Sequence, residues 1–387
     1  MTDCCPTRPD DPEAAVRSRY SAAAREREAA LCCPVDYDPR YLEVIPEEVL
    51  ERDYGCGDPS RFVREGETVL DLGSGGGKIC FIAAQIVGPK GRVLGVDVNA
   101  EMLALARRSA PVVAGRLGFE NVEFLRGRIQ DLALDLDRLD AWLAEHPVQS
   151  SDDWSALESR AGSLRRDAPL VPSASVDLVV SNCVLNLVRP EDKGRLFREI
   201  HRVLRIGGRI AISDIVSDEP VPPHLRADPE LWSGCVSGAL EEREFLAHLA
   251  DAGFHGIRID GWEPEPFAVV EGIEFRSLTV TAHKGETEGC LDANQAVVYR
   301  GPWRQVEDDE GHVLRRGERT AVCARSFEIL TGEPYAPELV AVEPRVAVPE
   351  EERPAFACDR PARREPRESK GADYGETRKE GPGGSCC

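Results

Sequence analysis

Cysteine is the residue type whose number and placement in this sequence most strongly suggest chemistry. The chain holds 13 cysteines, and three pairs of them are adjacent: Cys4-Cys5, Cys32-Cys33 and Cys386-Cys387. Neighbouring cysteines rarely staple a fold, whereas they can chelate a soft ion or exchange disulfides. For the terminal pairs, exposed tail thiols without a role are an equally good interpretation. Because no Cys-x-x-Cys pair has the spacing of a zinc site, the sequence disfavours structural zinc.

Three single cysteines lie in distinctive surroundings. Cys56 is in the turn sequence Tyr54-Gly-Cys-Gly57, Cys183 in Val180-Ser-Asn-Cys-Val-Leu-Asn-Leu-Val188, and Cys235 in Leu231-Trp-Ser-Gly-Cys-Val-Ser-Gly-Ala-Leu240. Taken singly, a cysteine is more often a small buried hydrophobe than a ligand. Spacing along the chain does not bring the three together, so their proximity remains open at this stage.

A glycine-rich segment gives a second chemical signal. The apolar run Thr68–Leu72 continues into Asp71-Leu-Gly73-Ser-Gly75-Gly-Gly77, and residues 78–87 have a helical pattern. The glycines therefore lie at a strand-to-helix turn, where a ligand can approach bare backbone. Asp97 ends the next apolar run, where a carboxylate can accept hydrogen bonds from both hydroxyls of a ribose. The pattern predicts a nucleoside cofactor, which could also be a nicotinamide nucleotide, and a vestigial site that binds no cofactor is the other alternative.

Short apolar runs must position these groups. They alternate with helical stretches from Glu67 onward, which is typical of a doubly wound parallel sheet, and we predict a Rossmann-like α/β domain over residues 61–218. Ligands of this fold bind at the carboxyl edge of the sheet, where Cys183 would lie. The five runs are Thr68–Leu72, Arg92–Asp97, Val122–Leu125, Val176–Ser181 and Gly208–Asp214.

The segments outside this core have their own patterns. Residues 1–60 predict an N-terminal arm, in which Val16 and Tyr20 are spaced as on an amphipathic helix. An insert over 132–173 has leucines at helical spacing and predicts an extra helix or a lid. Residues 219–285 predict an α+β subdomain and 286–348 a small module with strands at Ala296–Tyr299 and Thr320–Cys323. From residue 349 to 387 the polar composition predicts a disordered tail.

Net charge and hydropathy narrow the class of protein. The chain carries 69 acidic and 48 basic side chains, a formal charge of -21, so its field would repel a nucleic acid. The first residues lack an apolar segment, and no run of 18 apolar residues occurs, which disfavours a secretory signal and a membrane span. We therefore expect a cytoplasmic protein without nucleic-acid or membrane partners.

Several of these motifs together resemble known enzymes. With Leu204-Arg-Ile-Gly-Gly208 before the fifth run, the glycine turn and Asp97 resemble class I S-adenosylmethionine-dependent methyltransferases. Adding Tyr-Gly-Cys-Gly, Val-Ser-Asn-Cys-Val-Leu-Asn-Leu and Leu-Trp-x-x-Cys-x-x-Gly-Ala-Leu, the chain is similar to arsenite methyltransferases over most of residues 31–285. The insert after Leu132 and everything beyond Cys290 depart from the animal members.

The resemblance implies a site and a reaction. Cys56, Cys183 and Cys235 would bind arsenic from arsenite or its thiol conjugates, and Cys32 or Cys33 would form a redox disulfide with Cys56, reset by a thioredoxin or glutathione system. The arsenic lone pair would attack the methyl group without a general base, which agrees with the absence of a candidate base in the core. The S-adenosylmethionine-binding residues would be Asp71, Gly73, Ser74, Gly75, Gly77, Asp97, Met102, Ile129 and Asn182.

Two alternatives stay open on sequence alone. A methyltransferase acting on a small organic molecule would keep the glycine turn and use the cysteines for packing only. A thiol protein that binds arsenic or another soft metal without turnover would use the cysteines, although an intact cofactor loop argues against it. Replacing Cys183 by Ser and following a labelled methyl group separates the three.

Overall fold

The computed structural model describes residues 12–26, 28, 35–286, 290–357, 363–371 and 374–375. The chain forms two compact units, Met1–Lys284 and Gly285–Cys387, and each is described by itself.

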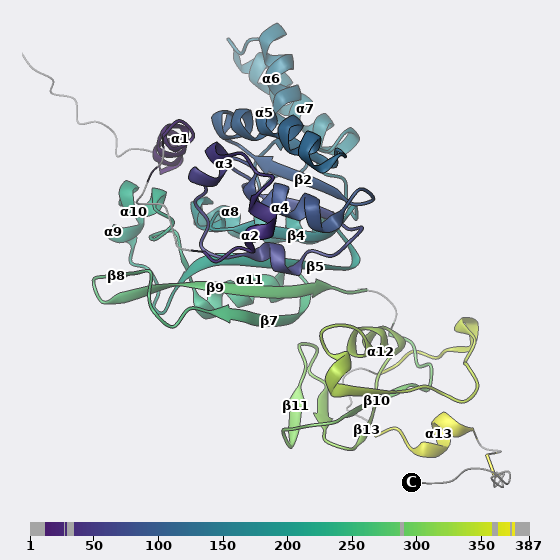
Figure 1. Ribbon diagram of the computed structural model, residues 1–387. Coiled ribbons are helices and arrows are strands. Elements are labelled where there is room, and N and C mark those ends of the chain that lie inside the picture. The colour runs from purple at the N-terminus through teal and green to yellow at the C-terminus, as the bar shows by residue number, and fades with distance from the viewer. Residues whose placement is uncertain are drawn as a thin grey trace, which may run out of the picture. The chain divides into compact units, whose positions relative to one another are not determined.

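A nine-stranded sheet forms the centre of the first unit (Figure 1). Seven of its strands lie in the order β3-β2-β1-β4-β5-β9-β7, while β6 pairs with β5 and β8 pairs with β9. Neighbours among the first five strands in this order are parallel. β9 runs antiparallel to both β5 and β7. The predicted runs are these parallel strands, so the doubly wound, Rossmann-like α/β class is confirmed. The strands are β1 (Thr68–Leu72), β2 (Arg92–Asp97), β3 (Val122–Arg126), β4 (Val176–Asn182), β5 (Leu204–Ser217), β6 (Leu240–Glu241), β7 (Phe254–Trp262), β8 (Ala268–Val270) and β9 (Ile273–Lys284).

Helices bury both faces of this sheet, which is why its parallel strands are nearly continuous apolar runs. Successive side chains of a strand point to opposite faces. Leu70 and Leu72 thus pack into one core with Phe197, whereas Val69 packs into the other with Phe81. The helices are α4 (Lys78–Val87) and α5 (Ala100–Leu117) on the Phe81 side, and α8 (Pro190–Val203) and α11 (Glu242–Asp251) on the Phe197 side.

Short helices lie at the carboxyl edge of the sheet and along its α4–α5 side. α1 packs against α10 and also contacts α5, so the N-terminal arm lies beside the predicted site. The carboxylates of Asp38 and Asp228 start α2 and α10 by accepting backbone N–H groups, and a proline follows each of them. These elements are α1 (Pro12–Ala23), α2 (Pro39–Leu42), α3 (Glu47–Glu51), α9 (Pro223–Arg226), α10 (Pro229–Ser233) and the 3-10 helices η2 (Pro59–Phe62) and η3 (Leu185–Leu187).

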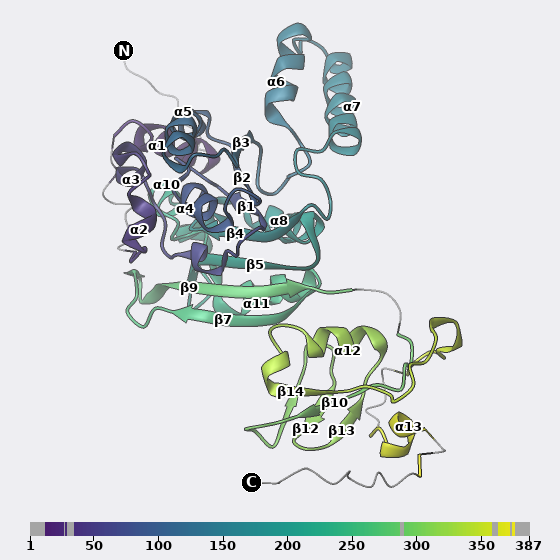
Figure 2. The ribbon, with the colours of Figure 1, turned by 45° about the vertical axis from the view of Figure 1, so that its right-hand side comes forward.

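The insert between β3 and β4 forms two helices, α6 (Leu136–Glu145) and α7 (Ser151–Asp167). Figure 2 shows this pair projecting from the rest of the first unit. Leu136 and Leu139 pack against a small cluster formed by Leu134, Ala161 and Leu164. The leucine spacing predicted an extra helix or a lid; the insert instead holds two helices, which pack against each other.

The second unit has a three-stranded antiparallel sheet of order β13-β10-β14. Val297 and Tyr299 of its central strand pack with Phe327 and Leu330 of α12. Its elements are β10 (Ala296–Tyr299), β11 (Gln305–Glu307), β12 (Val313–Arg315), β13 (Arg319–Ala321), α12 (Ala324–Thr331), η4 (Ala336–Glu338), β14 (Leu339–Val342), η5 (Glu350–Glu352) and α13 (Pro366–Lys370).

The prediction of a disordered tail from residue 349 is wrong for the part of the tail that the structure describes. Ala355 forms a β-bridge with Leu291. The Arg364 side chain is only 5% exposed and its guanidinium lies 2.6 Å from the Asp292 carboxylate. The prediction from composition assumed that the charged residues of this segment are exposed to solvent. In the structure, Arg364 is buried against Asp292, and this ion pair holds the described part of the tail against the second unit.

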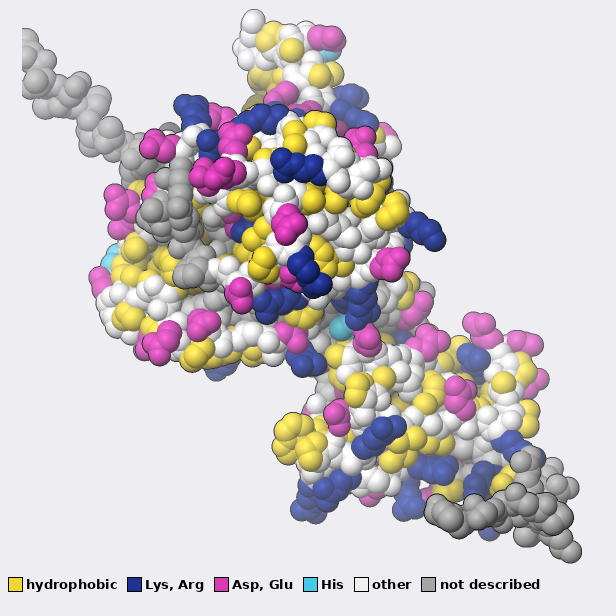
Figure 3. All heavy atoms as spheres, in the orientation of Figure 1, with side chains coloured by type: hydrophobic (Ala, Val, Ile, Leu, Met, Phe, Trp, Pro, Cys, Tyr) yellow, Lys and Arg dark blue, Asp and Glu magenta, His cyan; other side chains and the backbone are white. Residues whose placement is uncertain are grey.

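Charged side chains of both signs are interspersed over the face seen in Figure 3. Some of these exposed side chains form ion pairs, such as Arg92 with Glu123. Exposed ion pairs contribute little to stability. Within the described part of the chain, no helix combines the length and apolar character needed to cross a membrane.

Candidate active site

The glycine turn between β1 and α4 opens onto a cavity of about 190 Å³. Gly73, Gly75 and Gly77 all have positive φ, which glycine adopts without strain. A Cβ at Gly73 would lie 2.4 Å from Val184, while at Gly75 no described atom lies within 4 Å. Gly73 and Gly75 line the cavity. At Gly77 a Cβ would instead meet Phe124 and Phe81, so its lack of a side chain serves packing beneath the turn.

Acidic and hydroxyl groups line the same cavity. Asp97 accepts hydrogen bonds from Gly75 N at 2.8 Å and Asn99 N at 2.7 Å, which fixes its carboxylate at the end of β2. Burial raises the pKa of Asp71 to about 7, partly offset by the hydrogen bond from the Cys80 thiol. Ser74 Oγ is buried and has no hydrogen-bond partner among the described residues. These groups suit a ligand with hydroxyl groups and a positive charge.

The cavity contains most of the residues predicted to bind the cofactor. Sequence reasoning did not single out Gly76, Tyr54 and Asn99, which also line it, and it noted Tyr20 only as part of an amphipathic helix. The predicted residues among the lining are Asp71, Gly73, Ser74, Gly75, Asp97, Met102, Ile129 and Asn182, joined by Cys183.

Cys183 lies immediately after β4, at the carboxyl edge of the sheet. Its φ is 60°, a left-handed conformation that is uncommon for a residue with a side chain. The turn that follows is held by Asp214, whose Oδ2 accepts hydrogen bonds from Val184 N and Leu185 N. The fully buried Lys193 donates to Leu185 O at 3.0 Å. A buried polar network thus fixes the turn that carries this thiol.

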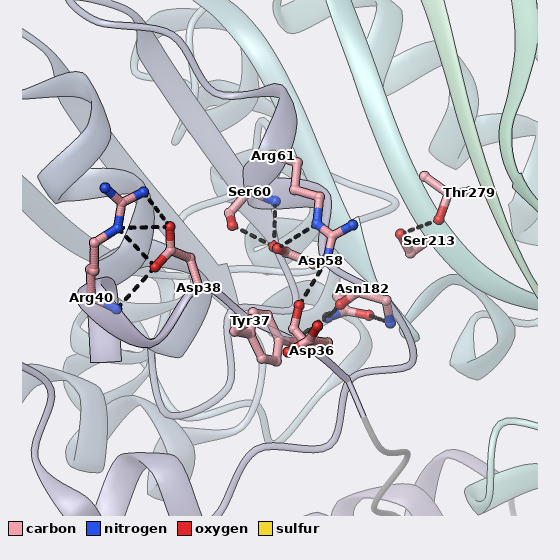
Figure 4. A network of polar contacts seen from close by, with 11 residues as sticks. Asp36, Tyr37, Asp38, Arg40, Asp58, Ser60, Arg61, Asn182, Ser213 and Thr279 are labelled. Atoms are coloured by element: carbon pink, nitrogen blue, oxygen red, sulfur yellow. Dashed lines mark hydrogen bonds and ion pairs between the residues drawn. The ribbon is translucent and has the colours of Figure 1, made fainter. Parts of the chain in front are cut away.

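Cys56 is positioned by the side chain of Asn182, the residue before Cys183. Asn182 Oδ1 accepts hydrogen bonds from Cys56 N at 2.8 Å and Gly57 N at 3.1 Å. Its Nδ2 donates to Gly57 O at 2.7 Å and Tyr37 Oη at 3.2 Å, and Figure 4 shows Asn182 beside Tyr37. The amide therefore uses two acceptor and two donor sites on this turn. Asn182 lines the cavity at the glycine turn, yet its polar atoms bind the Cys56 turn.

Cys235 follows α10 and also has a left-handed φ, 62°. Its Sγ donates to Cys183 O at 3.1 Å. Asn186 Nδ2 donates to Cys235 O at 3.1 Å and to Ile215 O at 2.7 Å, joining the turn after β4 to the turn after α10. This buried asparagine holds the two thiol-bearing turns together.

The three thiols converge in one buried cluster, packed with Ile215 and Phe275. Hydrogen bonds with Cys235 and Cys56, together with burial, raise the pKa of the Cys183 thiol well above its ordinary value. Burial raises the pKa of Cys56. Over the described residues, no group of three His, Cys, Asp or Glu side chains is arranged to hold a metal ion. The three thiols therefore form a hydrogen-bonded set.

The remaining predicted residues fall outside this cluster. Cys32 and Cys33 lie outside the described residues. Cys80 is fully buried in α4 and donates to Asp71, a packing position that agrees with its apolar surroundings in the sequence. The lining of the cavity at the glycine turn includes Cys183 but, among the described residues, neither Cys56 nor Cys235. Cys183 thus lies between the cavity and the other two thiols.

The strand order, the glycine turn and the cavity at the carboxyl edge define a class I S-adenosylmethionine-dependent methyltransferase. Residues 64–166 and 157–253 match the family described as "Methyltransferase domain". Residues 286–374 match "Domain of unknown function (DUF8838)".

Comparisons with individual proteins define the family. The chain is 34% identical to an arsenite methyltransferase of Aquipseudomonas alcaligenes, covering 79% of this chain and 83% of that protein. It is 30% identical to the arsenite methyltransferase of Mus musculus, covering 77% and 73%. The crystal structure of CrArsM, an arsenic(III) S-adenosylmethionine methyltransferase from Chlamydomonas reinhardtii, has 28% identity and a TM-score of 0.55, covering 82% and 99%. The chain belongs to the arsenite methyltransferase family.

Proposed function

We propose that this protein transfers methyl groups from S-adenosylmethionine to trivalent arsenic held by Cys56, Cys183 and Cys235. The observation that carries the proposal is the convergence of three thiols from separate segments beside the cofactor cavity. Trivalent arsenic is a soft centre that prefers thiolate ligands, and three of them would hold it while leaving a lone pair free.

Arsenic uptake requires no base at this site. Arsenite carries three hydroxyl groups, and each Cys S–H can replace one of them, so that three As–S bonds form and three water molecules leave. The raised pKa values of Cys56 and Cys183 keep these thiols protonated, which supplies the hydrogens for that water. Cys235 Sγ must give up its hydrogen bond to Cys183 O during the exchange, because it loses its only hydrogen.

The residues of the cavity fit S-adenosylmethionine. Asp97 would accept from the ribose hydroxyls, Met102 and Ile129 would contact the adenine, and the unpartnered Ser74 hydroxyl and the Asp71 carboxylate would face the amino acid end. When bound, the cofactor supplies a methyl group on a positively charged sulfur. Cys183 lines this cavity, so arsenic bound there would present its lone pair toward the methyl group, and no proton has to leave arsenic.

A redox step would follow each transfer. Methylation leaves a positively charged, pentavalent arsenic. When two of its cysteine ligands join as a disulfide, one As–S electron pair forms the S–S bond and the other returns to arsenic; a thiol of the reductant then binds in the freed position and loses its proton, which gives neutral trivalent arsenic. We propose that this reductive sequence ends with a disulfide between Cys56 and Cys32 or Cys33. A dithiol or glutathione-type reductant, such as a thioredoxin or glutathione system of the cytoplasm, would then supply two electrons and two protons to restore the thiols.

Methyl transfer from labelled S-adenosylmethionine to arsenite tests the function, with thiol reductant present and the products separated by chromatography. We expect methylated arsenic from the wild type, none from Cys183→Ser, and wild-type activity from Cys290→Ser, an exposed thiol of the second unit. Binding of arsenite and cofactor without transfer would favour a thiol-binding protein. No interaction with arsenite would favour a methyltransferase for organic substrates.

A further inference from the structure

Helix α1 spans the cofactor cavity and the thiol cluster. Tyr20 lines the cavity from this helix, together with Val16. Next to it, Arg19 Nη1 donates to Ser233 Oγ at 3.1 Å, on the segment that leads to Cys235. On the cofactor side, Ser21 Oγ accepts a hydrogen bond from Asn99 Nδ2 at 3.1 Å. The helix is therefore fixed to both parts of the site.

Tyr20 contacts a thiol directly. Its hydroxyl lies 3.5 Å from Cys235 Sγ, and its ring packs edge-on against Tyr54, with 6.2 Å between the ring centroids. Cys235 Sγ already donates its single hydrogen to Cys183 O. The Tyr20 hydroxyl must therefore be the donor and the sulfur the acceptor.

The Tyr20 hydroxyl stays protonated, and so remains a hydrogen-bond donor, to a higher pH than the hydroxyl of an exposed tyrosine. Burial, and then the neighbouring Cys235 thiol, raise the pKa of Tyr20 well above its ordinary value, so the hydroxyl keeps its hydrogen. When Cys235 loses its own hydrogen, its contact with Cys183 O has no donor left. The Tyr20 hydroxyl can still donate a hydrogen bond to this sulfur, and so it still orients the Cys235 side chain.

We propose that Tyr20 is a positioning residue, whose O–H group directs the sulfur of Cys235 toward the arsenic site and couples helix α1 to the thiol cluster. This inference rests on the proposed function for its catalytic consequence, but not for the contact itself. It assigns the N-terminal arm a part in organising the site, in addition to covering the cofactor cavity.

The variant Tyr20→Phe removes the hydroxyl and keeps the ring against Tyr54. Tyr41→Phe, on α2 and packed with the α4–α5 side of the core, is the matched control. A sulfur that has given up its hydrogen and bound arsenic carries more negative charge than a thiol sulfur, so the Tyr20 hydrogen bond strengthens on binding. Its loss should therefore weaken arsenite binding about tenfold. Equilibrium dialysis of the reduced full-length protein, without S-adenosylmethionine, measures this binding.

A second readout separates positioning from loosening of the fold. The thiolate is the species that iodoacetamide alkylates, and the lost donor stabilises it. In Tyr20→Phe the fraction of Cys235 present as thiolate should fall about tenfold. Each remaining thiolate is a stronger nucleophile, which compensates in part, so alkylation of Cys235 should be about threefold slower. General loosening would instead accelerate alkylation of Cys56, Cys183 and Cys235 together. Peptide mass spectrometry reports each site separately.

The outcomes are distinguishable. Slower alkylation confined to Cys235, with weaker arsenite binding, supports the inference. Unchanged alkylation of Cys235, or faster alkylation of all three thiols, overturns it, whatever arsenite does. If the wild type fails to bind arsenite, the proposed function fails, while the alkylation rates still decide the role of Tyr20.

Discussion

The Cys56 turn gives the sharpest prediction of the structure, through the variant Asn182→Ala. This change removes four hydrogen bonds, three to the backbone of Cys56 and Gly57 and one to Tyr37. A typical hydrogen bond contributes about 1 kcal/mol net, so the loss is about 2–4 kcal/mol, the lower values applying where water enters the partly buried turn. The cost falls on one turn, so local opening should increase more than global unfolding.

Alkylation of Cys56 in the reduced full-length protein measures this opening. A loss of about 3 kcal/mol raises the open population about a hundredfold, and the alkylation rate should rise in proportion. Asn121→Ala is the control: its Nδ2 donates to Ala84 O and Gly88 O, away from the thiols. That variant should lose some stability, as urea unfolding would show, but leave the Cys56 rate unchanged. A wild-type Cys56 rate in folded Asn182→Ala would refute the assigned role of this amide.

Three further changes address other parts of the molecule. Burial raises the pKa of Asp71 to about 7, and a cationic ligand favours the charged carboxylate. The affinity for S-adenosylmethionine should therefore rise with pH, by up to about tenfold per pH unit, and become constant above about pH 7. Calorimetry measures this affinity, and in Asp71→Asn it should not depend on pH in this way. Asp214→Asn places an amide against Val184 N and Leu185 N and should cost about 1–3 kcal/mol in urea unfolding; an unchanged midpoint would contradict it. Arg364→Ala removes the ion-pair partner of Asp292 and should destabilise the second unit by about 2–4 kcal/mol. Hydrogen exchange should become faster in β10 and β14, while the affinity for S-adenosylmethionine should not change.

The sheet could be predicted because the strands of a doubly wound fold are short apolar runs between helices. The predicted run Val176–Ser181 differs from β4 by one residue, and Thr68–Leu72 agrees with β1. The glycine turn could be placed for the same reason: glycines with positive φ mark a strand-to-helix turn. Both signals are local in sequence.

The convergence of the thiols could not be derived from spacing. Cys56, Cys183 and Cys235 meet only because β4, the turn before β1 and the turn after α10 lie at one edge of the sheet. These cysteines could be singled out by resemblance to a family. The hydrogen bonds of Asn182 to the Cys56 turn and of Tyr20 to Cys235 depend on tertiary contacts that the sequence does not reveal. Neither residue type signals such a role at its position.

The second helix of the insert could have been predicted from its start signal in the sequence. The second helix of the insert starts at Ser150, whose hydroxyl accepts Asp153 N at 3.2 Å, and Ser-x-x-Asp is a recognisable start signal for a helix. The ordered tail left no comparable signal, because only the folded chain shows that Arg364 is buried against Asp292.

X-ray absorption at the arsenic edge of the arsenite-loaded, reduced full-length protein is the most direct test of the account. Three sulfur neighbours in the wild type, and the loss of one of them in each of Cys56→Ser, Cys183→Ser and Cys235→Ser, are the predicted result. Arsenic that keeps oxygen neighbours in the wild type, or a sulfur count unchanged in the Cys183→Ser variant, would contradict the three-thiol site.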